Sequence, residues 1–405
     1  MIKAEVMQTK LGEILKGWEI CSLGDVAYFS NGKSSPERSD SFNYEVFGSN
    51  GIIGRAAQYN STEGTVIVGR VGSYCGSVYF SKNKCWVTDN AIIGLPRENS
   101  AAGFLYYLLL NLDLNNHRSG SGQPLLNQGI LNSINVSIPL LKEQRAIAKI
   151  LSDLDEKIEL NHRMNKTLEV IAQAIFKQWF VDFNFPDEKG RPYKDSGGRM
   201  IDAEFGEIPV TWYTGTFSEV AENPRRGVAP NEIEPSTGYI GLEHMPRHCI
   251  ALSNWGLAEG LESNKSAFQA GEILFGKLRP YFHKVGVAPL DGVCSTDILV
   301  VVPKNPEWFG FVLGHISSVD FVNHTSAGST GTRMPRTNWQ DMADYKMPIP
   351  QQTLAESFSE HVKPLIARII ANIHQSRTLV DIRDSLLPKL ISGKIRLENF
   401  VGAKL

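Results

Sequence analysis

The sequence has few cysteines and no long apolar run. Its five cysteines stand far apart, without a C-x-x-C pair, so the sequence predicts neither a zinc site nor a disulfide scaffold. The most apolar stretch, Phe104 to Leu110, is too short to span a bilayer. The first residues also lack the apolar core of a signal peptide. We therefore expect a cytoplasmic protein with no membrane segment and no metal site.

An excess of charge of either sign is also missing. The 41 Lys and Arg residues nearly balance 43 Asp and Glu residues, so the net charge of −2 gives no overall attraction to polyanions. Acidic residues are nevertheless absent from four windows, between residues 63 and 89, 113 and 143, 272 and 291, and 320 and 341. Such windows suit a surface that faces phosphates. Apolar strands and polar turns with few charges of either sign would give the same pattern.

Catalytic motifs are absent as well. Asn223-Pro224 continues as Arg225 and Asn305-Pro306 continues as Glu307, so neither is the Asn/Asp-Pro-Pro-aromatic motif of an amino-methyltransferase. The segment 29–34 resembles the end of a phosphate-binding loop, but Ala27 stands where the first glycine belongs. We therefore expect no catalytic residue and no cofactor in this chain.

The sequence does contain an internal repeat. Trp18 lies eight residues before Val26-Ala27, and Trp212 lies eight residues before Val220-Ala221. Further segments match in the same order: 64–70 with 271–277, Thr88-Asp89 with Thr296-Asp297, the glycine loop 119–122 with 328–331, and 138–140 with 347–349. Each copy then continues into a long segment of helical periodicity. The pattern predicts two similar globular units, each followed by its own helix.

Each globular copy is predicted to be a mixed, strand-rich domain. β-Branched and aromatic residues bounded by glycine predict strands at 65–68, 75–80, 273–275 and 298–302. Length and composition predict helices at 104–112 and 308–322. The fold class is therefore α+β. The segment 185–209 between the first long helix and the second copy is predicted to be irregular.

The two long segments predict a coiled coil. Apolar residues recur about every 3.5 positions from 143 to about 183 and from 354 until Pro388 and Gly393 interrupt the pattern. The predicted seam contains Leu151, Leu154, Ile158 and Asn161 in the first helix, and Leu365, Ile369 and Asn372 in the second. Because the second helix must return toward the first domain, we expect an antiparallel pair with pseudo-twofold symmetry and with Asn161 near Asn372. Ile171, Trp179 and Phe180 are expected to stay uncovered for a partner.

Three segments resemble the specificity subunits of type I restriction-modification systems: 138–158, 176–183 and 386–394. The resemblance implies target recognition domains at 1–141 and 205–350, a spacer helix at 142–184, a connector at 185–204 and a C-terminal spacer helix at 351–405. Each domain would then read one half of a bipartite, asymmetric site in double-stranded DNA. The helices would set the spacing and dock two modification (methyltransferase) subunits, to which restriction/translocase subunits attach. S-adenosylmethionine and ATP/Mg would bind those partners.

The candidate DNA-binding residues lie in the acid-free windows. Lysines and the Gly-Ser loops are expected to contact phosphates, and arginines and glutamine to contact base edges. The candidates are Arg70, Ser73, Tyr74, Ser119, Ser121 and Gln123 in the first domain, and Lys277, Arg279, Tyr281, Ser329, Thr330, Thr332 and Arg333 in the second. Arg70 could instead form a salt bridge with Asp89. The alternatives to a DNA reader are a duplicated protein-protein adaptor, which would not bind duplexes by sequence, and an enzyme, whose isolated chain would turn over a substrate.

Overall fold

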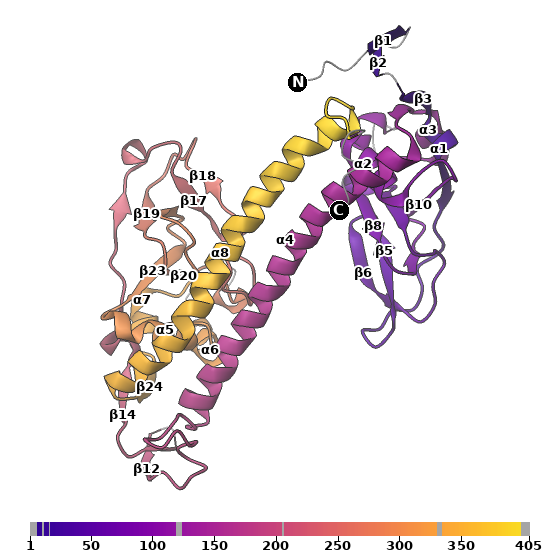
Figure 1. Cartoon of the computed structure of the whole chain (residues 1–405). Helices are drawn as coiled ribbons and strands as arrows, with labels where there is room; N and C mark the ends of the chain where they lie inside the picture. Colours follow the sequence, from indigo (N-terminus) through magenta and orange to yellow (C-terminus); the bar gives the residue numbers. More distant parts are fainter. Residues whose placement is uncertain are drawn as a thin grey trace. The chain divides into compact units, whose positions relative to one another are not determined.

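The chain forms two compact units in the computed structural model (Figure 1), which describes residues 6–9, 12–15, 17–118, 124–204, 206–329 and 334–397. The first unit combines Met1–Lys157 with Leu379–Leu405, and the second is Ile158–Thr378. Two long helices, α4 (Leu141–Phe176) and α8 (Gln352–Ile391), contribute to both units. The predicted α+β class with long helices is confirmed, whereas the domain boundaries stay predictions.

The first unit is built around two small sheets. The four-stranded sheet has the order β4 (Ala27–Asn31), β10 (Ala91–Pro96), β7 (Thr65–Gly69) and β8 (Val78–Ser81). The three-stranded sheet has the order β6 (Gly51–Ala56), β5 (Tyr44–Gly48) and β9 (Cys85–Val87), and β5 runs parallel to β9. Further elements are the hairpin β1 (Val6–Thr9) and β2 (Gly12–Leu15), the pair β3 (Glu19–Ser22) and β11 (Asn135–Ile138), the helices α1 (Leu23–Val26), α2 (Ala102–Asn111) and α3 (Gln128–Ser133), and the 3₁₀ turn η2 (Leu114–His117).

The core of the first unit joins its sheet to both long helices. Helix α2 lies against β7 and β8 and buries Phe104, Leu105 and Leu109 completely. The same apolar cluster contains Ile147 and Leu151 from α4, and Leu387, Leu390, Ile391 and Leu397 from the C-terminal part of the chain. At the edge of this core, Arg396 Nε donates to the buried carboxylate of Glu143 over 3.1 Å. The first domain is therefore completed by residues from the far end of the sequence.

The second unit repeats this topology and extends the three-stranded sheet by two strands. Its four-stranded sheet has the order β15 (Ala221–Glu222), β23 (Ile298–Pro303), β20 (Ile273–Gly276) and β21 (Val285–Val287). Its five-stranded sheet has the order β16 (Gly227–Val228), β19 (Lys265–Phe268), β22 (Gly292–Cys294), β17 (Gly238–Ile240) and β18 (Gly256–Leu257), with β17 parallel to β22. The hairpin β12 (Met200–Ala203) and β13 (Gly206–Pro209) and the pair β14 (Tyr213–Thr216) and β24 (Lys346–Ile349) also have counterparts in the first unit.

Helices α4 and α8 run antiparallel within the second unit (Figure 1). Asn161 Nδ2 donates to Ser376 Oγ over 3.2 Å and to Gln375 Oε1 over 2.9 Å, and Asn372 Nδ2 donates to Asn165 Oδ1 over 2.8 Å. A step of four residues forward along α4 is thus matched by four residues back along α8. The expectation that Asn161 lies near Asn372 was wrong by one helical turn. Asn161 bonds to Ser376, one turn beyond Asn372 along α8, and Asn372 bonds to Asn165, one turn beyond Asn161 along α4.

The burial of the predicted seam follows this register. Leu151, Ile158, Asn161, Ile369 and Asn372 are buried, whereas Leu154 and Leu365 are half-buried. At this point of the seam the buried residue is Ile366, which is 4% exposed, and not its neighbour Leu365. After α4 the chain continues as a π-helix, η3 (Lys177–Val181). Trp179 and Phe180 were expected to be uncovered but are buried, because they pack against Phe358 of α8.

Several predicted elements have different limits in the structure. The helix expected at 308–322 is two helices, α5 (Phe309–Ile316) and α6 (Val319–Ala327), because the Ser318 side chain accepts a hydrogen bond from Phe321 N–H and starts a new helix. The strand expected at 75–80 begins only at Val78, after a 3₁₀ turn, η1 (Gly72–Tyr74). The segment 185–209, expected to be irregular, contains the paired strands β12 and β13.

Helix α8 also passes Pro388, where an interruption was expected. A proline in a helix removes one backbone hydrogen bond, but its neighbours Leu387, Leu390 and Ile391 are buried in the core of the first unit. That apolar burial offsets the lost bond. The helix ends three residues later, and Gly393 has a φ of 69°, as is usual for a residue that follows a helix C-terminus. Among the described residues, no helix combines the length and apolar character needed to cross a membrane.

Candidate nucleic-acid interface

Three chain segments meet at the end of β7 in the first unit. Arg70 N–H donates to the carbonyl of Asn90 over 2.9 Å, and Leu126 N–H donates to the carbonyl of Arg70 over 3.0 Å. Val71 forms a bridge with Leu125. We call residues 70–71, 90 and 125–126 the first junction. It joins both acid-free windows of the first copy, because 124–126 directly follow the predicted glycine loop.

The second unit contains the same junction at the end of β20. Lys277 N–H donates to the carbonyl of Asp297 over 2.9 Å, Thr337 N–H donates to the carbonyl of Lys277 over 3.1 Å, and Leu278 forms a bridge with Arg336. We call residues 277–278, 297 and 336–337 the second junction. The hydrogen bonds make Asn90 the counterpart of Asp297, so the sequence alignment of Thr88-Asp89 with Thr296-Asp297 was wrong by one residue.

An exposed tyrosine follows each junction at the same place. Tyr74 ends the 3₁₀ turn η1 and is 50% exposed, and Tyr281 lies in the 3₁₀ turn η7 (Pro280–Phe282) and is 52% exposed. Ser73 beside Tyr74 is exposed as well. A phenol that projects from a short, rigid turn can stack on a base or sugar and donate a hydrogen bond to a phosphate. The turns thus place two of the predicted residues beside the predicted cations Arg70 and Lys277.

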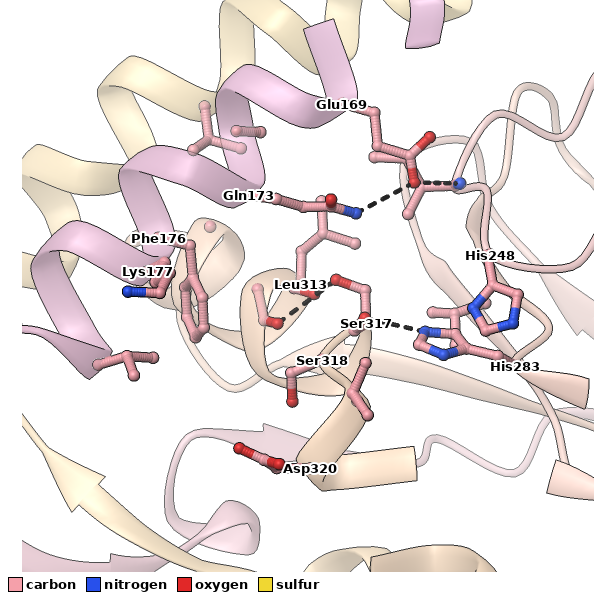
Figure 2. Close-up of a pocket in the computed structure, with 18 of the residues that line it drawn as sticks. Glu169, Gln173, Phe176, Lys177, His248, His283, Leu313, Ser317, Ser318 and Asp320 are labelled. Carbon is pink, nitrogen blue, oxygen red and sulfur yellow. Dashed lines mark hydrogen bonds between the residues drawn. The ribbon is translucent and has the colours of Figure 1, made fainter. Parts of the chain in front are cut away.

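Both turns begin and end in the left-handed backbone region. Gly72 and Gly76 have φ values of 75° and 89°, and their counterparts Arg279 and His283 both have a φ of 51°. His283 is buried, and its Nε2 lies 2.9 Å from the carbonyl oxygen of Ser317 (Figure 2). Burial lowers the pKa of the His283 ring. The hydrogen bond fixes the end of the second turn to the residue that directly follows helix α5 (Phe309–Ile316).

Arg70 does not form the salt bridge with Asp89 that the sequence left open. Its Nη1 donates to the backbone carbonyl of Asp89 over 3.3 Å, and its Nε has no hydrogen-bond partner among the described residues. The side chain is half-buried. An arginine fixed at one end by a backbone carbonyl retains donors for a ligand at the first junction.

The glycine loops themselves fall mostly beyond what the structure describes. Ser119, Ser121, Gln123, Thr330, Thr332 and Arg333 lie outside the described residues. Ser329, at the end of α6, donates through Oγ to the Ser326 carbonyl over 2.6 Å. The sequence reasoning missed Arg336, whose Nε donates to Asp297 Oδ1 over 3.1 Å in the second junction. Its position directly after the glycine loop was the signal that could have identified it.

The second unit also contains a pocket of about 540 Å³ beside His283 (Figure 2). The pocket is lined by apolar side chains such as Phe176, together with Glu169 and Cys249. The Glu169 carboxylate accepts a hydrogen bond from Ile250 N–H over 2.9 Å, and burial raises its pKa. Burial also raises the pKa of the Cys249 thiol to about 11. The half-buried thiol therefore stays protonated at neutral pH.

Comparison with known proteins favours the DNA reader among the alternatives. Residues 15–170 match the family model of the type I restriction modification DNA specificity domain. The resemblance to type I specificity subunits is confirmed. The chain is 24% identical to the type I restriction enzyme MjaIX specificity subunit of Methanocaldococcus jannaschii, with 98% of each chain covered. It is also 24% identical to the EcoDI specificity subunit of Escherichia coli, with 95% of this chain and 90% of the relative covered.

The fold agrees with a solved structure of the same kind. The crystal structure of the S subunit of a type I restriction-modification system from M. genitalium superposes with a TM-score of 0.63 at 16% identity, over 92% of this chain and 96% of that one. This likeness shows a shared fold. The specificity-domain match and the named relatives support a DNA sequence-specificity role in a restriction-modification complex.

Proposed function

We propose that each globular domain reads one half of a bipartite DNA site through its junction and the turn that follows. The observation that carries this proposal is that the same junction of three segments is built twice. In each unit the junction contains a cation and the residues that follow a Gly-Ser loop, and an exposed tyrosine lies in the turn after it. Duplex DNA that passes such a surface would meet donors for phosphates and side chains for base edges together.

The local charges support contact with a polyanion. Arg70 lies at the first junction, and Lys277 and Arg336 lie at the second. Asp297 is the one carboxylate within the junctions as defined, and its pairing with Arg336 reduces its repulsion of phosphates. We therefore expect affinity to fall with rising salt, as it does for proteins that displace counterions from DNA.

The long helices are proposed to set the half-site spacing and to dock two methyltransferase subunits. Helix α4 exposes Leu160, Val170 and Ile171 by 42%, 54% and 41%, and α8 exposes Ile382 by 41%. Leu160 and Ile171 are eleven residues apart, so they lie on one face of the helix. Apolar side chains on a helix face suit a protein partner better than DNA. Restriction/translocase subunits would then attach to the methyltransferase subunits in the cytoplasm.

In this assignment the chain is a non-catalytic subunit. S-adenosylmethionine and ATP/Mg would bind to its partners, so the chemistry of methylation and cleavage would be theirs. Substrate turnover by the isolated chain would contradict it.

The test is modified-base sequencing of DNA from a host that expresses this chain together with its modification subunit. We expect methylation at a bipartite, asymmetric motif that is absent when the modification subunit is expressed alone. A complex that assembles but neither methylates nor binds duplexes by sequence would favour the duplicated protein-protein adaptor instead.

A further inference from the structure

The start of the turn after each junction is a position at which the two domains share a backbone conformation but differ in side chain. Gly72 begins the turn η1 in the first domain, and its counterpart Arg279 directly precedes the turn η7 in the second. Both residues have a positive φ, 75° for Gly72 and 51° for Arg279. The first domain therefore demonstrates that glycine satisfies this backbone position, and the second domain uses an arginine there.

An arginine is an unfavourable residue for this conformation. The left-handed region brings Cβ close to the following carbonyl oxygen, so a residue with a side chain is less stable there than glycine. A proline follows Arg279, and the residue before a proline is restricted further. Backbone strain that glycine would remove is usually retained where the side chain has a function.

The second domain holds this conformation with contacts on both sides of the turn. Arg279 N–H donates to the Pro335 carbonyl over 2.8 Å, and Phe282 N–H donates to the Arg279 carbonyl over 2.9 Å. At the far end, His283 is fixed through its ring to the Ser317 carbonyl over 2.9 Å (Figure 2). The turn that carries Arg279 is thus held at its start and at its end.

The ion pair between Asp297 and Arg336 ties the same segments together. The Asp297 carbonyl accepts the hydrogen bond of Lys277 N–H, two residues before Arg279. The Asp297 side chain accepts the hydrogen bond of Arg336, next to the Pro335 carbonyl that binds Arg279 N–H. The first domain has Asn90 and Leu125 at these two positions and therefore has no such ion pair there.

We infer, on the basis of the proposed function, that Arg279 reads a guanine in the second half-site and that the Asp297–Arg336 pair is a positioning element for it. A guanidinium group can donate two parallel hydrogen bonds to O6 and N7 of guanine in the major groove. A turn held at both ends presents that group with little loss of conformational entropy on binding. The first domain reads its half-site without an arginine at this position.

The test uses the full chain in complex with its modification subunit and a library of randomised DNA duplexes. Arg279→Gly places in the second domain the residue that the first domain already has. Because it relieves the left-handed strain, we expect the variant to unfold at the same temperature as the wild type or higher. Its preference for one G·C pair of the second half-site should fall 10- to 100-fold, the range for one bidentate base contact. The first half-site should stay unchanged.

Two further variants separate positioning from general stability. Asp297→Asn copies the first domain and should weaken the same G·C preference, by less than Arg279→Gly does. Glu204→Gln removes a partner of Lys346, an exposed ion pair of 2.7 Å in the same unit that does not include a junction residue. It should leave the selected motif unchanged.

The outcomes distinguish this inference from the proposed function. A wild-type complex that selects a bipartite motif, with Arg279→Gly retaining both halves, overturns the role of Arg279 and leaves the proposed function standing. Loss of both half-sites in the folded variant also overturns it, because the effect is then not confined to one domain. A wild-type complex that selects no motif overturns both.

Discussion

Replacing Asn372 with leucine should destabilise the helix pair although the change makes its core more apolar. Asn372 is 1% exposed and donates to Asn165 Oδ1 over 2.8 Å, and Asn165 is itself only 5% exposed. The substitution leaves the buried Asn165 side chain without this hydrogen bond. An unsatisfied buried polar group costs about 1–3 kcal/mol, so the free energy of unfolding should fall by roughly that amount despite the added apolar surface.

The double variant Asn165→Leu/Asn372→Leu should recover this loss. Replacing both partners of a buried hydrogen bond with apolar groups is nearly neutral or stabilising, and leucines in the seam add apolar burial. The measurement is urea-induced unfolding of the full chain followed by circular dichroism, with Arg368→Leu as a control on the exposed surface of α8. The control should stay within about 0.5 kcal/mol of the wild type. A neutral single variant, or a double variant no more stable than the single, would refute the reasoning.

Three further predictions concern DNA reading and pH. Exchanging residues 205–350 for the corresponding domain of a relative should alter one half of the methylated motif in modified-base sequencing; a change in both halves would show that the domains are not independent. Gel-shift titration should give far tighter sequence-specific binding with the modification subunit than without it, and equal affinities would show that DNA binding does not depend on this partner. Burial lowers the pKa of His315 from an ordinary value of 6.5 to about 3, so its contribution to stability is fully present above pH 6.5 and is lost as the pH falls toward 3. Between pH 6.5 and 5 this loss should be about 2 kcal/mol, and His315→Leu should show a correspondingly flatter dependence of unfolding free energy on pH.

The long helices were predictable because one physical pattern extends over ten turns. Apolar residues at a spacing near 3.5 require a continuous partner surface, and the polar residues Asn161 and Asn372 marked its centre. The pattern did not give the pairing register, because it constrains each helix alone. Trp179 and Phe180 were misplaced for a related reason: their partner Phe358 is distant in sequence. Periodicity thus predicted the helices. It did not predict which side chains of one helix are buried by the other.

The candidate interface was predicted in part, through repetition. Matching windows around Arg70 and Lys277 identified the strand ends where each junction forms. The ion pair of Arg336 with Asp297 could not be predicted, because it depends on a backbone hydrogen bond between segments far apart in sequence. The left-handed conformation of Arg279 could not be predicted either, because a positive φ at a residue other than glycine leaves no pattern in the sequence.

The closure of the first domain by the end of the chain has a consequence for biosynthesis. Leu387, Leu390 and Ile391 belong to the same core as Phe104 and Leu105. A ribosome completes the sheet of the first domain long before it delivers these three residues. Until then, the apolar surface that they cover is open to water and to chaperones. A segment that is synthesised after the second domain thus completes the first domain, so a chain cut short after the second domain would lack part of the core of the first.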